Sequence, residues 1–233
     1  MKNKTFLAII PAREGSKRLP NKNIKNLNGK PLIYYSISAS LKSKYITETV
    51  VSTDSSEIRE IANKFGASTP FLRPKELSHD ESSSIEVVIH CINYYKEVLN
   101  KEFDYVILLQ PTSPLRDELD LDGAIEFLLK KSADAVVSVT EVEHNPIWSN
   151  VLDDSNSMEN FLDKKYLNKR SQDLPTYYRL NGAIYICNTS KLIEENTFFI
   201  SKNIFAFRML QEKSIDIDTK LDFIIADSLM SFK

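Results

Sequence analysis

Residues 6–23 read FLAIIPAREGSKRLPNKN, which is a short apolar run followed at once by a basic loop. The run at residues 6–10 predicts a buried strand. From Arg13 to Lys30 the chain has six Lys or Arg residues and one acidic residue, Glu14. In open α/β sheets ligands bind beyond the carboxyl ends of the strands, so a cationic loop there suits a polyanion such as a triphosphate. A solvated basic loop that binds nothing is the alternative.

This loop differs from the two common glycine-rich nucleotide motifs. Gly15, Ser16 and Lys17 lack the earlier glycine and the spacing of a Walker A motif, and the loop does not match a dinucleotide-binding fingerprint. The whole chain has only five glycines in 233 residues. We therefore expect Arg and Lys side chains, rather than a glycine-rich loop, to contact phosphate.

Apolar runs and helical periods alternate along much of the remaining chain. This alternation predicts an α/β fold with a mainly parallel sheet flanked by helices. The second helix is expected to start at a capping box formed by Asp54 and Glu57 and to stop at Gly66. Strands are expected near residues 6–10, 50–51, 105–109, 135–139 and 182–187, and helices near residues 31–41, 54–65, 85–99, 121–129 and 219–230.

The length of 233 residues suits a single domain that spans residues 1–233. The strand–helix rhythm breaks at residues 141–179, where the sequence is polar and irregular. Long irregular segments inside a domain are usually functional, so we expect a lid, an insertion or a dimerisation arm there.

Composition excludes several classes of protein. With 42% hydrophobic and 27% charged residues, the chain is neither disordered nor collagen-like. A net charge of −2 gives no basic footprint for nucleic acid, and no apolar run approaches the ~18 residues of a membrane span. Cys91 and Cys187 lie in apolar runs and are expected to be buried free thiols. We therefore expect a cytoplasmic protein that binds neither nucleic acid nor a membrane.

A pair of carboxylates lies near the other end of the sequence. Residues 214–218 read SIDID, and in a strand Asp216 and Asp218 would project from one face. Two carboxylates at this spacing can share a hard cation such as Mg²⁺, with substrate phosphates completing its octahedral shell. The alternative is that Asp218 caps the helix expected from Thr219. A basic loop and an acidic pair together favour phosphoryl chemistry, either nucleotidyl transfer or hydrolysis.

Six motifs in order resemble those of the acylneuraminate cytidylyltransferases, also called CMP-sialic acid synthetases. The motifs span nearly the whole chain, which makes the resemblance specific. They are AIIPAR at residues 8–13 with GSK at 15–17 and NKN at 21–23, STD at 52–54, RP at 73–74 with Leu77, LLQPTSPLR at 108–116, NGAIYI at 181–186 and SIDID at 214–218.

The resemblance implies a nucleotide-diphospho-sugar transferase-like fold and a Mg²⁺-dependent reaction. The anomeric hydroxyl of a nonulosonic acid would attack the α-phosphate of CTP and give a CMP-sugar and pyrophosphate. The resemblance also implies a homodimer in which an arm of one subunit reaches the site of the other. Residues 141–179 are where we expect that arm.

Site residues are implied position by position. Catalysis would fall to Arg13, Lys17 and Lys22. The nucleotide would be held by Arg13, Ser16, Lys17, Lys22, Asn23, Arg73 and Ser84, the sugar acid by Gln110, Arg170, Gln172, Tyr185, Phe198 and Phe199, and Mg²⁺ by Asp216 and Asp218. Core packing is the alternative for the two phenylalanines. A rigid turn is the alternative for the segment around Gln110, because two prolines restrict it.

The chain departs from the family pattern at several positions. Glu14 and Arg18 stand where many relatives have glycine, and Ser171 separates Arg170 from Gln172, which are adjacent in many relatives. The sugar therefore stays open among sialic, legionaminic, pseudaminic and Kdo-like acids. A non-catalytic CTP-binding protein on the same fold is a further alternative.

Overall fold

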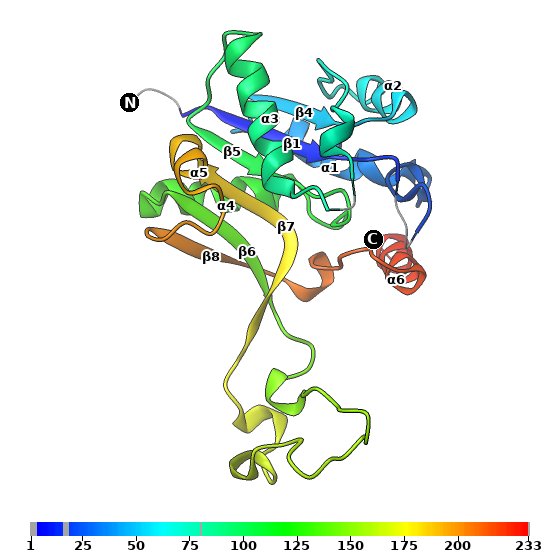
Figure 1. Ribbon diagram of the computed structural model, residues 1–233, viewed down its shortest axis with the longest axis vertical. Coiled ribbons are helices and arrows are strands. Elements are labelled where there is room, and N and C mark those ends of the chain that lie inside the picture. The colour runs from blue at the N-terminus through cyan, green and yellow to red at the C-terminus, as the bar shows by residue number, and fades with distance from the viewer. Residues whose placement is uncertain (1–3, 16–18, 80, 233) are drawn as a thin grey trace.

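The computed structural model describes residues 4–15, 19–79 and 81–232. Ser16 and Lys17, both expected at the phosphates, lie outside the described residues. Six strands form one sheet in the order β4-β1-β5-β7-β6-β8 (Figure 1). They are β1 (Phe6–Pro11), β4 (Glu48–Ser52), β5 (Tyr105–Leu108), β6 (Ala135–Glu141), β7 (Tyr178–Asn188) and β8 (Ile204–Met209).

Most neighbouring strands of this sheet are parallel. β1 pairs in parallel with β4 and β5, and β6 pairs in parallel with β8. β7 runs antiparallel to both of its neighbours, β5 and β6. The prediction of an α/β fold with a mainly parallel sheet is therefore confirmed, and β7 is its reversed strand.

Helices cover both faces of the sheet, because successive side chains of a strand point to opposite faces. Ala8 and Ile10 of β1 belong to the core cluster that includes α1, α2 and α4, whereas Leu7 and Ile9 belong to the cluster of α3 and α5. All four side chains are fully buried. The helices are α1 (Leu32–Lys42), α2 (Ser56–Lys64), α3 (Ser84–Glu97), α4 (Glu118–Lys131), α5 (Thr189–Glu195) and α6 (Lys220–Ser231).

A third, smaller cluster joins α6 to the segment that follows the basic loop. β2 (Asn26–Leu27) and β3 (Lys30–Pro31) form a two-stranded hairpin there. Leu27 and Leu32 pack with Ala226 of α6 and with Ile217, which belongs to the SIDID segment. This cluster holds together two parts of the chain that are far apart in sequence.

The second helix starts later than expected. The residue at its N-cap position is Ser55, so the prediction of a capping box formed by Asp54 and Glu57 is wrong. The Asp54 carboxylate has a different partner, because its Oδ1 accepts a hydrogen bond from the backbone amide of Glu14 at 3.0 Å. Asp54 therefore ties the start of the basic loop to the end of β4. Gly66, with φ +93°, follows the end of the helix as expected.

A bulge interrupts the pairing of β6 with β7. The register shifts opposite Ser138, and Gly182 on β7 adopts φ +71°. The Ser138 hydroxyl fills the bulge, because Oγ accepts a hydrogen bond from the Ile184 amide at 2.8 Å and donates to Asn181 Oδ1 at 2.6 Å. Beyond the bulge, β7 leaves the body of the sheet (Figure 1).

Residues 142–177, which we call the arm, project away from the body of the molecule (Figure 1). They connect β6 to β7 and contain three 3-10 helices, η3 (Pro146–Trp148), η4 (Lys164–Tyr166) and η5 (Ser171–Asp173). Several apolar side chains of the arm are exposed, including Val151 at 90% and Leu167 at 58%. Exposed apolar side chains in such numbers are typical of an interaction surface.

Arg116 is the largest fully buried side chain and joins three elements near the carboxyl end of β5. Its Nη1 donates to the Ala183 carbonyl oxygen of β7 at 2.6 Å and, more weakly, to the Gln110 carbonyl oxygen at 3.5 Å. Its Nη2 donates to the Ser36 hydroxyl of α1. Burial lowers the pKa of Arg116 to about 10, so the guanidinium remains charged at neutral pH.

Two further expectations concern the core and the membrane. Cys91 and Cys187 are both buried free thiols, as predicted. Among the described residues, no helix is long and apolar enough to cross a membrane.

Candidate functional site

A cleft of about 600 Å³ opens beyond the carboxyl ends of β1 and β5. Eight of the predicted site residues line it: Arg13, Lys22, Asn23, Arg73, Ser84, Gln110, Asp216 and Asp218. Sequence reasoning gave no role to three further polar residues that line it, His79, Ser82 and Thr112. Thr112 stands inside the LLQPTSPLR motif, which is the signal that could have identified it.

Lys22 joins the basic loop to the acidic pair across this cleft. Its Nζ donates to the Ile217 carbonyl oxygen at 2.7 Å and lies 3.0 Å from Asp218 Oδ1. Only 12% of the Lys22 side chain is exposed. The two charged motifs, almost 200 residues apart in sequence, therefore meet as expected at one site.

The SIDID segment reaches the cleft without forming a strand. Residues 214–218, all of them described, have no ladder pairing, so the alternation of strand geometry is not what brings the two carboxylates together. The Ile217 amide instead donates to the Thr112 carbonyl oxygen at 2.8 Å, and the Ile217 side chain is fully buried. These contacts turn Asp216 and Asp218, on either side of Ile217, toward the same cleft.

The helix-capping alternative for Asp218 is also wrong. The N-cap residue of α6 is Thr219, which forms a capping box with Asp222. The Asp218 amide donates to Asp222 Oδ2 at 3.1 Å, so the backbone of Asp218 supports the helix start. The Asp218 carboxylate, in contrast, faces Lys22.

The carboxylates of Asp216 and Asp218 repel each other in the cleft. Protein atoms that crowd the Asp216 carboxylate raise its pKa above the ordinary value, a hydrogen bond from Thr112 opposes the rise, and the charge of Asp218 adds to it. Solvent nevertheless reaches the Asp216 side chain. Carboxylate oxygens are the donors that hard divalent cations prefer, and a cation would relieve the repulsion, so this pair fits Mg²⁺.

Such a cation would need further oxygen ligands from a substrate or from water. The described part of the chain holds no group of three or more His, Cys, Asp or Glu side chains that could bind a metal ion. Mg²⁺ is usually held by one or two carboxylates together with substrate phosphates, so two carboxylates are sufficient on the protein side.

Two arginines and an amide, Arg13, Arg73 and Asn23, also line the cleft, and we call them the arginine wall. Arg73 is 6% exposed, and its Nη2 donates to the Ser52 carbonyl oxygen. Burial lowers the pKa of Arg73, the charge of Asp54 opposes this, and the nearby charge of Arg13 adds to the lowering. Asn23 is buried, and its Nδ2 donates to the Arg13 carbonyl oxygen at 2.9 Å. These contacts make a rigid, positively charged wall.

Gly182 gives Gln110 its place in the cleft. A Cβ atom at Gly182 would lie 2.7 Å from Gln110 Oε1 and 3.6 Å from Asp216 Oδ2. The positive φ at Gly182 also disfavours any side chain there. The NGAIYI motif therefore brings the backbone of β7 close to the Gln110 side chain. The glycine in this motif is the feature of the sequence that indicates such a close approach.

The predicted aromatic residues do not line the cleft. The Tyr185 ring packs 5.8 Å from that of Phe198 and 6.2 Å from that of Phe199, measured between centroids. Phe198 is 6% exposed, belongs to the core cluster of α3 and α5 and does not line the cleft, which agrees with the core-packing alternative. Phe199 is 52% exposed. Burial raises the pKa of Tyr185, and the charge of Asp216 adds to this.

Arg170 and Gln172 lie on the arm, and neither lines the cleft. The Arg170 guanidinium pairs with Asp173, Nε to Oδ2 at 3.1 Å. The arm projects away from the body (Figure 1), so the fold separates these two residues from the other predicted sugar ligands of the same chain.

The raised pKa of Asp216 leads to a prediction about stability. The folded protein binds this proton more tightly than the unfolded chain does, so ionisation of Asp216 disfavours folding as the pH rises. We expect Asp216→Asn to be more stable than the natural protein at pH 7, with a smaller gain near pH ~4, the ordinary range of Asp. Urea unfolding midpoints at both pH values measure the difference.

Asp218→Asn is the contrast variant in this experiment, because it gives up the ion pair with Lys22. We expect no gain at pH 7 for this variant. Equal midpoints at pH 7 for Asp216→Asn and the natural protein would contradict the prediction.

Comparison with known proteins identifies the family of the chain. The profile of a family described as Cytidylyltransferase matches residues 7–229. CMP-N,N'-diacetyllegionaminic acid synthase of Legionella pneumophila subsp. pneumophila is 40% identical over 231 residues, which are 97% of this chain and 96% of that protein. N-acylneuraminate cytidylyltransferase of Streptococcus agalactiae serotype V is 40% identical over 222 residues, but these cover 94% of this chain and only 51% of that protein.

A solved structure of similar fold is CMP:2-keto-3-deoxy-manno-octonic acid synthetase complexed with CTP. The two chains are 18% identical and superpose with a TM-score of 0.72, and the aligned region covers 98% of this chain and 99% of that chain. The match over residues 7–229 and the relatives at 40% identity confirm the resemblance found in the sequence. The chain belongs to the cytidylyltransferase family.

Proposed function

We propose that the protein transfers the cytidylyl group of CTP to a nonulosonic acid, giving a CMP-sugar and pyrophosphate. One observation carries this proposal: the basic loop and the acidic pair meet in a single cleft, with Lys22 Nζ 3.0 Å from Asp218 Oδ1. The names of the two relatives at 40% identity, a CMP-sugar-acid synthase and an N-acylneuraminate cytidylyltransferase, support the same reaction.

The reaction exchanges one phosphorus–oxygen bond for another. The anomeric hydroxyl oxygen bonds to the α-phosphorus of CTP, the bond from that phosphorus to the bridging oxygen breaks, and pyrophosphate leaves with the electron pair. The hydroxyl proton passes to solvent. Arg13 and Lys22, with Lys17 by its motif position, would stabilise the phosphate charge, because Arg offers paired donors and Lys a mobile point charge. Catalysis would then rest on positioning and electrostatics, without a covalent intermediate.

The acidic pair would hold the cation. Asp216 and Asp218 are the residues proposed to bind Mg²⁺, which when bound supplies positive charge to the triphosphate oxygens. Lys22 already lies beside this pair, with its flexible stem inside the cleft. It can therefore exchange the Asp218 carboxylate for a phosphate oxygen once a nucleotide is bound.

Arg73, Asn23 and Ser84 would hold the cytidine. Arg73 lines the cleft, and its guanidinium is held in place by the carbonyl oxygens of Ser52 and Leu77, to which Nη2 and Nη1 donate. A guanidinium has five N–H donors, so one of them can bond a carbonyl oxygen of the base. Asn23 and Ser84, which line the same cleft, would assist Arg73, while Ser16 is assigned to the phosphates by its motif position alone.

A panel of sugar acids tests the proposed reaction. The protein is incubated with CTP and Mg²⁺ and with sialic, legionaminic, pseudaminic or Kdo acid. We expect pyrophosphate release and a CMP-sugar mass with an N-acylated nonulosonic acid, and loss of turnover after chelation of the metal. Sialic acid is our first expectation for the sugar. No turnover with any of these acids would refute the proposed reaction. CTP binding without turnover would then favour the non-catalytic alternative.

Gly182→Ala tests whether Gln110 contacts the sugar acid. The new Cβ would displace the flexible Gln110 amide, and we expect the KM for the sugar acid to rise about tenfold, the equivalent of one lost hydrogen bond. The Kd for CTP without metal should change less than about twofold, because the three atoms nearest to the added Cβ include none of Arg13, Asn23, Arg73 and Ser84, and Asp216 Oδ2 at 3.6 Å is at ordinary contact distance.

Gly29→Ala is the matched control, because Gly29 has φ +82° but nothing within 4 Å of its Cβ position. Both variants place alanine at positive φ and should lose about 1 kcal/mol of stability or more. An unchanged KM for the sugar acid in Gly182→Ala would remove Gln110 from the sugar site.

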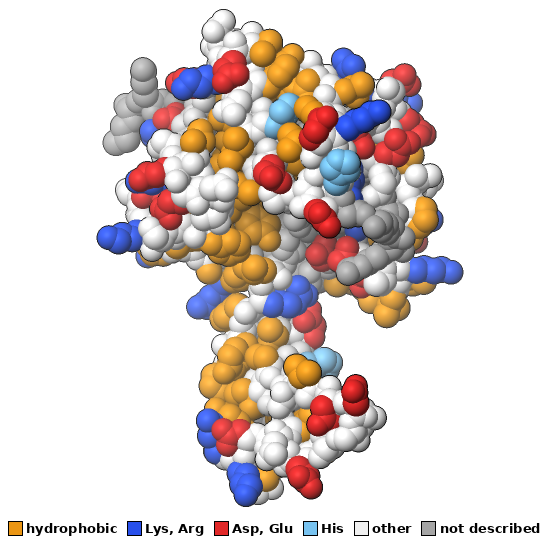
Figure 2. All heavy atoms as spheres, viewed as in Figure 1, with side chains coloured by type: hydrophobic (Ala, Val, Ile, Leu, Met, Phe, Trp, Pro, Cys, Tyr) orange, Lys and Arg blue, Asp and Glu red, His pale blue; other side chains and the backbone are white. Residues whose placement is uncertain are grey.

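We also propose that the arm mediates a homodimer. Val151, Met158 and Leu167 are exposed on it, and Figure 2 shows hydrophobic side chains gathered along one side of this projection. A partner surface would bury them at a gain of roughly 25 cal/mol per Å². In such a dimer, Arg170 and Gln172 would serve the site of the other subunit, because neither lines the cleft of its own.

Sedimentation equilibrium tests the dimer. We expect a mass twice the 26.7 kDa of one chain, and a single-chain mass for the double variant Val151→Asp, Leu167→Asp, because buried unpaired charges are costly. Ile193→Asp is the control, since Ile193 is 48% exposed on α5, away from the arm. A dimer that persists in the double variant would show that the arm is not the interface.

The location that we propose is the cytoplasm. The two cysteines, Cys91 and Cys187, are buried free thiols, which suits a reducing compartment. Fractionation of the source cells would test this location.

A further inference from the structure

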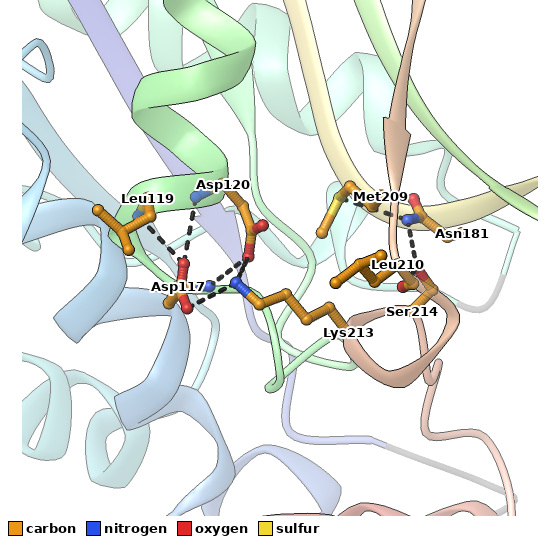
Figure 3. A network of polar contacts seen from close by, with 8 residues as sticks. All are labelled: Asp117, Leu119, Asp120, Asn181, Met209, Leu210, Lys213 and Ser214. Atoms are coloured by element: carbon orange, nitrogen blue, oxygen red, sulfur yellow. Dashed lines mark hydrogen bonds and ion pairs between the residues drawn. The ribbon is translucent and has the colours of Figure 1, made fainter.

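Lys213 forms a double ion pair just before the acidic pair in the chain. It is the last residue of the 3-10 helix η6 (Gln211–Lys213), three positions before Asp216. Its Nζ lies 2.7 Å from Asp117 Oδ2 and 2.9 Å from Asp120 Oδ2, at the start of α4 (Figure 3). The side chains of Lys213 and Asp120 are only 18% and 14% exposed, so solvent screens this contact weakly.

The two aspartates make a rigid partner for the lysine. Asp117 Oδ1 accepts hydrogen bonds from the Leu119 and Asp120 amides, and Asp120 Oδ2 accepts one from the Asp117 amide at 3.0 Å. This capping box already satisfies the start of α4 through its own backbone. The helix therefore does not need Lys213 for its cap, whereas Lys213 gains a fixed point on the sheet-packed helix.

A second anchor follows at the next residue. The Ser214 hydroxyl accepts a hydrogen bond from Asn181 Nδ2 at 2.9 Å and donates to the Leu210 carbonyl oxygen at 2.7 Å (Figure 3). Asn181 belongs to the bulge of β7 and precedes Gly182. The start of the SIDID segment is thus tied both to α4 and to the bulge.

The far end of the segment is anchored as well. The Ile217 amide donates to the Thr112 carbonyl oxygen at 2.8 Å, and the Ile217 side chain is buried. Asp216 lies between these two anchors on a stretch without ladder pairing. The segment between Ser214 and Ile217 is short, and each residue spans at most ~3.6 Å, so the backbone at Asp216 can move little while both ends are held. The path from Lys213 to Asp216 is therefore only three residues long, so a shift of Lys213 that also moves Ser214 would reach the Asp216 carboxylate.

We propose that Lys213 is a positioning residue, whose ion pairs with Asp117 and Asp120 set the placement of Asp216 relative to Asp218 for binding a divalent cation. The inference rests on the proposed function of this pair. Partly buried ion pairs add little net stability when both partners are considered, so a positional role explains this one better than a stabilising role does. Residues that orient metal ligands typically change metal affinity or activity 10–100-fold when they are removed.

Lys213→Met tests the proposal through two readouts. Mn²⁺ binding in the presence of CTP is titrated by electron paramagnetic resonance, and kcat and the half-saturating Mg²⁺ concentration are measured with the preferred sugar acid. We expect the Kd for Mn²⁺ and the half-saturating Mg²⁺ concentration, which are the two cation readouts, each to rise about tenfold. The Kd for CTP without metal should change less than about twofold. Lys213→Arg, which keeps a cation for both aspartates, should restore both readouts to within about threefold of the natural protein.

Lys4→Met is the matched control. It breaks another 2.7 Å lysine–aspartate pair, with Asp104, at the opposite end of the sheet from the cleft. We expect its cation readouts to equal those of the natural protein. If Lys213→Met does not fold, Asp117→Asn removes one of the two carboxylate charges but keeps an N-cap oxygen, and should weaken Mn²⁺ binding in the same direction.

The two proposals fail separately. A natural protein that turns over no sugar acid refutes the proposed function, and the Mn²⁺ titrations then still judge the positioning role. The positioning role is overturned if the natural protein is active and the Lys213→Met variant keeps the same Mn²⁺ affinity and the same half-saturating Mg²⁺ concentration. A lower unfolding temperature with both cation readouts unchanged would show that Lys213 only stabilises the fold.

Discussion

The buried guanidinium of Arg116 is the constraint on which the site depends. A charge that is 2% exposed needs nearby acceptors, and its two terminal nitrogens find them in carbonyl oxygens of Gln110 and Ala183 and the hydroxyl of Ser36, whereas Nε has no partner among the described residues. Three elements must therefore converge on one point. That convergence brings the chain after β5 against the bulge of β7, so that Gln110 and Gly182 come into contact beside the acidic pair.

The cleft holds charges of both signs close together, and this arrangement suits a ligand that is itself charged. Arg13 and Lys22 would suit a triphosphate, Arg73 would suit the base, and Asp216 and Asp218 would suit a cation bound to the phosphates. In the free protein, Lys22 partly neutralises the acidic pair. The side chains required for binding are therefore already in place before any substrate arrives, and their charges nearly balance.

Local patterns were reliable where burial alone sets the structure. The apolar run of β1, the helix stop at Gly66 and the buried thiols agree with the fold, because each depends on near neighbours or on hydrophobicity. Local patterns gave the wrong structure where a residue far away in the sequence, or the absence of a neighbouring strand, decided the contacts. Asp54 has the spacing of a cap but bonds to the Glu14 amide, and the SIDID segment alternates like a strand but has no neighbouring strand.

By itself the sequence determined the alternating α/β architecture, the family, and eight residues of the cleft, because motif spacing and hydrophobic period are local properties of the chain. Only the tertiary structure decided that β7 is reversed, that Phe198 belongs to the core, and that Lys213 is joined to Asp117 and Asp120. These outcomes depend on which surfaces meet after packing. No single segment carries that information, since strand order and ion-pair partners are settled by the whole core at once.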